Sequence, residues 1–273
     1  MVHADNSLSP LVQLDRLGVD FGHQRVLRDI CLSIQRGETL AVIGESGCGK
    51  TVLLKTIIGL LYPTRGNVFF DGRALVAMDE QELTRQRIRF GFLFQQAALF
   101  DSMTIAQNIA FPLRQHSTKS EQEIRQIVLA RLAEVGLPEN VIRKKPAELS
   151  GGMRKRVGLA RALAMEPEII LYDEPTTGLD PIMSDVINEL IINTRRKHPV
   201  TSVLVTHDMR TARKVADRVV MLFPLARLSA DEPQVIYDGT PGQIDNAADS
   251  RVTQFVRGEA RERLMEMRSH NGS

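Results

Sequence analysis

Cysteine and aromatic residues are scarce in this sequence. Its 273 residues include two cysteines and no tryptophan, and aromatic residues make up 5% of the chain. The two cysteines, Cys31 and Cys48, form no CxxC pair and belong to no His/Cys cluster. They therefore provide neither a disulfide framework nor a zinc site, and we expect the chain to work in a reducing cytosol.

A strong excess of charge is also missing. Lysine and arginine together number 35 and aspartate and glutamate 33, which gives a formal net charge of +2. This balance argues against a polyanion binder whose affinity comes from a basic surface, so no nucleic-acid partner is expected. With 43% hydrophobic and 25% charged residues, the composition is that of an ordinary soluble domain.

Long hydrophobic runs are lacking as well. The longest apolar stretches, such as residues 169–172 and 219–223, are far shorter than a membrane span. The first ten residues do not have the basic region and apolar run of a signal peptide. The sequence thus predicts a chain that is neither secreted nor inserted into a membrane by itself.

Short apolar segments alternate with helical patterns along most of the chain. Strands are predicted at residues 11–19, 26–34, 39–43, 168–172, 201–205 and 231–239. Helices are predicted at residues 50–59, within 117–135 after an N-cap at Ser120, from Ser150 onward, and at 181–197. Strands that are apolar on both faces and alternate with helices predict an α/β fold, with a mostly parallel sheet covered on both sides.

The clearest motif is a glycine-rich turn between the strand at 39–43 and the helix after it. It reads Gly44-Glu45-Ser46-Gly47-Cys48-Gly49-Lys50-Thr51, which fits the phosphate-loop pattern G-x-x-x-x-G-K-[ST]. The glycines let backbone N–H groups turn toward phosphate oxygens, and the helix N-terminus adds positive partial charge. Because Lys50 suits the β- and γ-phosphates and Thr51 suits Mg²⁺, the motif predicts a nucleotide site.

Cys48 lies inside this loop, near Lys50 and a helix N-terminus. A thiol in such a position is expected to have a lowered pKa and to react as a thiolate. The alternative is a small residue that the loop merely tolerates. Under either interpretation, alkylation of Cys48 is expected to block nucleotide binding.

Acidic side chains follow a second apolar strand. Asp173 and Glu174 stand at the carboxyl end of the strand at 168–172, the edge at which open α/β sheets place their ligands. Asp173 is suited to hold Mg²⁺, and Glu174 to orient or deprotonate an attacking water. His207 ends the next strand and would approach the same edge. The alternatives are a solvated acidic turn and a structural histidine.

A further motif, Ser150-Gly151-Gly152, opens a helix and provides a second anion-binding N-terminus. A protein that binds one nucleotide with a single phosphate loop does not need a second anion-binding helix N-terminus. Together with the phosphate loop and the Asp-Glu pair, the motif resembles the ATP-binding-cassette ATPases, over about residues 11–242. The resemblance implies ATP with Mg²⁺, and a head-to-tail dimer with a second copy in which the Ser-Gly-Gly of one subunit closes over the nucleotide of the other.

The resemblance also implies roles for single residues. Phe21 corresponds to an aromatic ring that stacks on adenine, although a core aromatic is equally compatible with the local sequence. Gln95 corresponds to a glutamine that senses Mg²⁺ and the attacking water. Asp180 lies in the loop that crosses the dimer interface, and His207 corresponds to the γ-phosphate histidine.

The fold implied by the resemblance is a RecA-like P-loop NTPase with an N-terminal antiparallel β portion and an inserted α-helical subdomain. We expect a flexible N-terminus at residues 1–10 and the ATPase domain at 11–242, with its helical subdomain at about 97–165. Residues 243–273 would form a C-terminal extension.

A narrower resemblance comes from residues 98–104, 153–156, 172–182 and 252–258, which are similar to the ATPase subunit of the Mla/Mkl-type lipid transporters. It implies an integral membrane permease and an MCE-type lipid-binding protein as partners. The location implied is peripheral, on the cytoplasmic face of the inner membrane. Phe100 and Met103 would border the groove that receives a permease helix, or belong to the core. Residues 223–233 depart from the family pattern, because a shorter turn is usual before the last strand.

Other interpretations remain open. Arg154-Lys155-Arg156 could form a nucleic-acid patch, but the apolar face of the same helix favours an outward, solvated flank. The chain could serve an ABC importer or exporter for another substrate, or act as a soluble cassette ATPase on nucleic acid or ribosomes. A plain P-loop phosphotransferase would leave the Ser150–Gly152 motif without a purpose.

Overall fold

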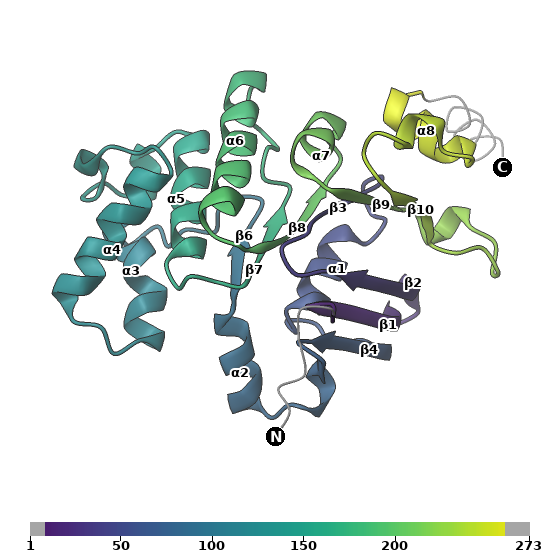
Figure 1. Ribbon diagram of the computed structural model, residues 1–273, viewed down its shortest axis with the longest axis horizontal. Helices are drawn as coiled ribbons and strands as arrows, with labels where there is room; N and C mark the ends of the chain where they lie inside the picture. The colour runs from purple at the N-terminus through teal and green to yellow at the C-terminus, as the bar shows by residue number, and fades with distance from the viewer. Residues whose placement is uncertain (1–8, 260–273) are drawn as a thin grey trace.

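The computed structural model describes residues 9–259, and a six-stranded sheet forms its centre (Figure 1). The strand order is β10-β9-β3-β8-β7-β6. Five neighbouring strands are parallel, and β10 pairs antiparallel with β9. The strands are β3 (Thr39–Ile43), β6 (Phe90–Leu93), β7 (Ile169–Asp173), β8 (Thr201–Thr206), β9 (Arg218–Leu222) and β10 (Val235–Gly239).

A second, antiparallel sheet packs on one face of the first, with the strand order β2-β1-β4-β5. Its strands are β1 (Val12–Phe21), β2 (Gln24–Ile34), β4 (Arg65–Phe70) and β5 (Arg73–Ala74). The predicted N-terminal antiparallel portion is thereby confirmed.

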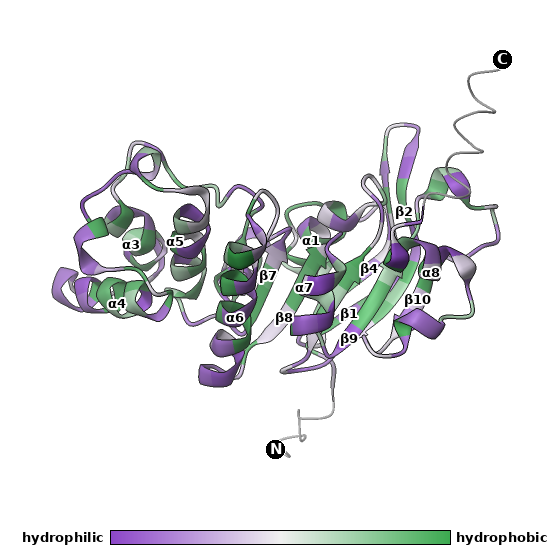
Figure 2. Ribbon diagram, turned by 90° about the horizontal axis from the view of Figure 1, so that it is seen from above, coloured by the Kyte–Doolittle hydropathy of each residue, from purple (hydrophilic) through white to green (hydrophobic). Residues whose placement is uncertain are grey.

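Strand periodicity divides the interior into two cores. Along β3, Leu40 and Val42 face the antiparallel sheet, whereas Ala41 and Ile43 face the helices on the other side. Successive side chains of a strand point to opposite faces, so a strand that is apolar throughout is covered on both. Figure 2 shows the resulting hydrophobic central strands beneath helices whose outer surfaces are hydrophilic.

Eight α-helices complete the described part of the chain. They are α1 (Lys50–Ile57), α2 (Glu80–Ile88), α3 (Ile105–His116), α4 (Glu121–Glu134), α5 (Gly151–Leu163), α6 (Pro181–Lys197), α7 (Met209–Val215) and α8 (Ser250–Arg257). Helices α3, α4 and α5 gather at the β6 end of the central sheet (Figure 1). Ser120, Ser150 and Asp180 accept backbone hydrogen bonds as the N-caps of α4, α5 and α6.

The α/β fold class predicted from the sequence is confirmed, with small shifts at element ends. Strand β10 begins at Val235, four residues after the predicted start at 231, because the chain first forms the short 3-10 helix η5 (Leu225–Arg227). The domain boundaries stay a prediction. Most of the predicted flexible N-terminus and residues 260–273 of the predicted extension lie outside the described residues. Between residues 9 and 259, no helix has the length and apolar character needed to cross a bilayer.

Candidate nucleotide-binding and catalytic site

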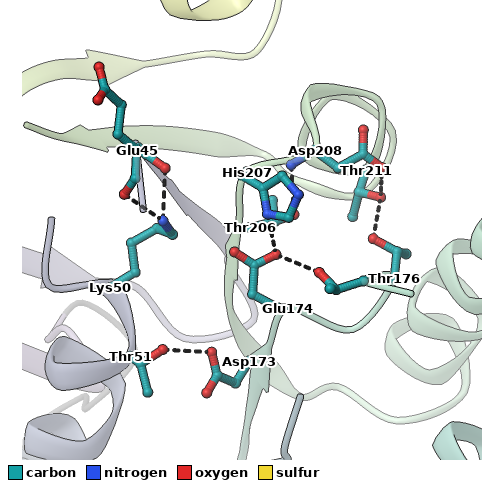
Figure 3. Close-up of polar contacts among 12 residues, drawn as sticks. Glu45, Lys50, Thr51, Asp173, Glu174, Thr176, Thr206, His207, Asp208 and Thr211 are labelled. Carbon is teal, nitrogen blue, oxygen red and sulfur yellow. Dashed lines mark hydrogen bonds and ion pairs between the residues drawn. The ribbon is translucent and has the colours of Figure 1, made fainter. Parts of the chain in front are cut away.

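The predicted site lies where three parallel strands end. Strand β3 leads into the phosphate loop, β7 ends in Asp173 and Glu174, and β8 ends next to His207. Strand β8 lies between β3 and β7, so the carboxyl ends of all three strands meet at one edge. Figure 3 shows the side chains from these three segments pointing into a common space.

The phosphate loop has a backbone that requires glycine. Gly44, Gly47 and Gly49 have φ angles of 147°, 83° and 102°, in the region that side chains disfavour. A Cβ atom at Gly44 would lie 2.2 Å from the carbonyl oxygen of Leu222. The buried Lys50 Nζ donates to the carbonyl oxygens of Gly44 (2.8 Å) and Glu45 (3.0 Å). The loop thus curves around an ammonium group at the N-terminus of α1, an arrangement that binds phosphate.

Thr51 and Asp173 form a pair of oxygen groups suited to Mg²⁺. The Thr51 hydroxyl donates to Asp173 Oδ1 at 3.0 Å, although 122 residues separate them in the sequence. Burial raises the pKa of Asp173, while the hydrogen bond from Thr51 opposes the rise. A buried carboxylate beside a hydroxyl fits the preference of Mg²⁺ for hard oxygen ligands and would gain from the positive charge of the ion.

Glu174 is held in one orientation by its neighbours. Its Oε2 atom accepts from the Thr177 hydroxyl at 3.0 Å and lies 2.9 Å from Nδ1 of His207. The residue has a φ of 47°, and its backbone N–H donates to the carbonyl oxygen of Val205 at 2.9 Å. This conformation is strained for a non-glycine residue, and such strain is often found at functional sites.

The prediction that residues 154–156 of α5 form a solvated flank is wrong for Lys155. It is only 5% exposed, so it does not belong to a solvated flank. Its ammonium donates to the carbonyl oxygens of Glu174 (3.2 Å) and Thr177 (2.7 Å) and thereby fixes the turn that carries Glu174. Burial lowers the pKa of Lys155 to about 8, against the opposing charge of Glu174. The sequence around Lys155 does not reveal that it supports the turn of Glu174, because this turn lies about 20 residues further along the chain.

Gln95 follows β6, next to the end of β7. Together with Gly151, Thr177 and Gly178, it lines a pocket of about 750 Å³. The structure therefore brings the predicted sensor to the loop whose Thr177 donates to Glu174. Gln95 is exposed and remains accessible to a ligand in this pocket.

Ser150 and Asp180 lie at exposed helix N-termini. The Ser150 hydroxyl accepts from the N–H of Met153 at 3.3 Å, and Asp180 Oδ1 accepts from that of Met183 at 2.9 Å. Helix α5 packs on α3, α4 and β6, whereas α1, which begins at Lys50, packs on β2, β7 and β8. The chain thus places its Ser-Gly-Gly motif on a different part of the molecule from its phosphate loop.

Phe21 is 49% exposed, which excludes the alternative of a core aromatic. It ends β1 at the turn into β2. The adjoining residues Gly22 and His23 line a pocket of about 620 Å³ together with Gly47 of the phosphate loop. Phe21 is thus next in sequence to residues of this pocket, although it is not one of the residues that line it.

The structure contradicts the expectation that the Cys48 thiol has a lowered pKa and reacts as a thiolate. Its side chain is buried, with 1% exposure, and burial raises its pKa although Lys50 lies nearby. The loop directs the thiol inward, where its Sγ atom occupies the space that a Cβ on Gly44 would need. The Cys48 thiol is therefore not presented to a ligand at the surface of the loop.

We expect N-ethylmaleimide to modify the exposed Cys31 at least about tenfold faster than Cys48 in the folded protein at neutral pH. Mass spectrometry of peptides taken over time measures both rates. The unfolded protein is the control, in which the two rates should converge. Faster labelling of Cys48 in the folded chain would contradict the buried placement of its thiol.

Comparisons with known proteins agree with this geometry. The family model described as "ABC transporter" matches residues 27–177. The "Intermembrane phospholipid transport system ATP-binding protein MlaF" of Haemophilus influenzae is 40% identical over 250 residues, which are 92% of this chain and 91% of that protein. The "Probable ribonucleotide transport ATP-binding protein mkl" of Mycobacterium tuberculosis is 46% identical over 78% of this chain, which spans only 59% of that protein's length.

Solved structures resemble the chain as well. The "Dimeric structure of a post-hydrolysis state of the ATP-binding cassette MJ0796 bound to ADP and Pi" matches with a TM-score of 0.74 at 32% identity, over 84% of this chain and 98% of that one. A structure of cbiO1 from Clostridium perfringens matches with a TM-score of 0.76 at 28% identity, over 94% of this chain and 99% of that one. The fold is thus shared with solved ATP-binding cassettes.

Proposed function

Because the chain belongs to the ATP-binding-cassette family of transporter ATPases, we propose that it binds and hydrolyses MgATP to drive a membrane permease. The observation that carries the proposal is the convergence of Lys50, Thr51, Asp173, Glu174 and His207 at one sheet edge (Figure 3). Nucleotide-binding cassettes that resemble the chain over most of its length support it.

Each residue of the site has a distinct task in the proposed reaction. Lys50 exchanges its two carbonyl partners for phosphate oxygens, and the N–H groups of the loop hold the remaining phosphate charge. Thr51 and Asp173 hold Mg²⁺, which supplies charge neutralisation at the phosphates. Glu174, oriented by Thr177 and His207, accepts a proton from the attacking water at its carboxylate.

The proposed active form is a head-to-tail dimer. Ser150 and Asp180 are both exposed, and α5, which Ser150 caps, packs on other elements than α1 does, so both residues can face a nucleotide held by a second copy. A helix N-terminus capped by serine and followed by glycines suits the γ-phosphate. The resemblance to a dimeric cassette supports this arrangement.

An apolar pocket supports docking of a permease helix. It measures about 480 Å³ and is lined by aromatic residues that include Phe90, Phe94, Phe100 and Phe111. Phe100 is 42% exposed, and its ring lies 4.8 Å from that of Phe111. The buried Asn108 holds the segment, because its side chain accepts from the N–H of Phe100 at 2.8 Å and donates to the same residue's carbonyl oxygen at 3.1 Å. A rigid segment that exposes an aromatic ring suits a helical partner.

The substitution Phe100→Glu should release the ATPase from its native membrane complex, because it places a charge where an apolar helix would dock. Co-purification from membranes measures the loss, which we expect to exceed about tenfold. Tyr62→Glu, at a ring that is 54% exposed and outside this pocket, is the matched control. Soluble Phe100→Glu protein should still bind ATP, whereas unchanged membrane recovery would contradict docking at this residue.

We propose a phospholipid or another lipid as the transported substrate, with an MCE-type lipid-binding protein as a further partner. A relative named for phospholipid transport aligns over nearly its whole length, whereas those named for ribonucleotide transport align over 59% to 61% of theirs. The location that follows is peripheral, on the cytoplasmic face of the inner membrane. Isolating the complex from its own membrane and identifying the bound proteins and lipids tests this assignment, and a bound water-soluble substrate without lipid would contradict it.

A further inference from the structure

Residues 223–234, here called the 223–234 loop, connect β9 to β10 and have no part in the function proposed above. The loop contains η5 (Leu225–Arg227). Its residues Pro224, Leu225 and Ala226 line the pocket of about 620 Å³ that also borders Gly47 and the β1–β2 turn. The loop therefore forms one wall of a pocket whose other walls are the phosphate loop and the turn after Phe21.

The buried side chain of Gln234 connects the end of this loop to β2 and to the phosphate loop. Gln234 is 2% exposed. Its Nε2 donates to the carbonyl oxygens of Val26 (3.0 Å) and Cys48 (3.1 Å), and its Oε1 accepts from the N–H of Arg28 at 2.8 Å. These bonds join the loop to β2 and to the phosphate loop, so the wall is pre-formed.

An ion pair makes a second connection. Arg227 Nη1 lies 2.6 Å from Oε1 of Glu45, and its guanidinium stacks over the ring of Phe223 at 4.7 Å. Glu45 is an acidic residue inside a loop predicted to bind phosphates, where its charge would repel the ligand. Arg227 offsets that charge from outside the phosphate loop.

Arg28 of β2 holds the middle of the 223–234 loop as well. Arg28 Nη2 donates to the carbonyl oxygens of Ser229 (2.8 Å) and Glu232 (2.5 Å). These hydrogen bonds lie within the chain itself, so the loop orders its own wall, and little ordering is left for ligand binding to impose.

We propose that the 223–234 loop is part of the nucleotide site, where Pro224, Leu225 and Ala226 contact the nucleoside half of ATP opposite the β1–β2 turn. The inference rests on the proposed ATP-binding function and adds to it a wall that recognises the nucleoside. Phosphates on the N–H groups of the phosphate loop direct the nucleoside toward the adjoining pocket, whose size is typical of small-molecule sites. The apolar side chains of Pro224, Leu225 and Ala226 suit the face of a base. Arg227 offsets the negative charge of Glu45, so that this residue can stand in the phosphate loop.

Calorimetric titration of the full chain with MgATP and with magnesium tripolyphosphate tests the wall, because only ATP carries a nucleoside. Leu225→Ala should weaken MgATP binding by about fivefold and leave tripolyphosphate binding unchanged, since it removes only apolar contact area. Leu190→Ala, at a half-buried leucine of α6, is the matched control and should change neither. Equal effects of Leu225→Ala on both ligands, or none on either, would overturn the inference alone, whereas wild-type protein that does not bind MgATP would overturn the proposed function as well.

Arg227 gives a second test, based on charge. Arg227→Ala should weaken the binding of both ligands by about tenfold, because it removes the positive charge next to Glu45. Adding Glu45→Gln should restore the binding of both, because it removes the negative charge that Arg227 faces. Photolabelling of the wild-type chain with 8-azido-ATP avoids any effect of substitution on folding. Labelled peptides that contain residues 224–226 support the wall, whereas absence of rescue together with labelling confined to other peptides contradicts it.

Discussion

Replacing Glu174 by glutamine should lower ATP turnover by at least ~10²-fold, the scale of a lost general base, and leave MgATP binding intact. Glutamine keeps the shape of the side chain and an oxygen for the Thr177 hydroxyl, but it accepts no proton from water. The retained partners also keep the strained turn in place, so the loss is specific to catalysis. Phosphate release by the purified complex measures turnover, and equilibrium titration measures binding.

The matched control is Glu189→Gln on α6, a glutamate whose carboxylate lies 2.9 Å from Lys214 Nζ, outside the site. This variant should hydrolyse ATP like the wild type. Hydrolysis at the wild-type rate by Glu174→Gln would exclude Glu174 as the base. A variant that loses MgATP binding as well would assign Glu174 to nucleotide binding instead.

The second large effect is expected from dimers that combine a Lys50→Ala subunit with a Ser150→Arg subunit. If each site takes Lys50 from one chain and Ser150 from the other, such a mixed dimer contains one intact site and one doubly broken site. It should trap about one nucleotide, whereas homodimers of either variant should trap none, because the phosphate contacts of both sites are lost. Differentially tagged subunits allow the mixed dimer to be isolated and its trapped nucleotide counted.

The separation of α5 from α1 within one chain is the structural reason for this expectation. Sites built within single chains would each be singly broken in the mixed dimer. The mixed dimer would then trap no more nucleotide than either homodimer, and the cross-subunit arrangement would be wrong. A mixed dimer of two wild-type subunits with the same tags controls for the effect of the tags.

Local chemistry is what the sequence by itself determined. The phosphate loop could be recognised because glycines followed by Lys50 and Thr51 act within a few residues of one another. The predicted caps at Ser120 and Ser150 follow from bonds between a side chain and a backbone N–H group three residues away. Continuous apolar strands predicted a covered parallel sheet, and the sheet in turn placed Asp173 and the phosphate loop at one edge.

Tertiary structure alone decided the contacts between distant segments and the burial of particular side chains. The fold turned Cys48 into the core, where loss of solvent raises its pKa against the effect of its sequence neighbour Lys50. It also buried Lys155 against the turn of Glu174, and it brought Gln234 to the phosphate loop from 186 residues away. Burial and long-range hydrogen bonding depend on which surfaces pack together, and no local residue pattern encodes that choice.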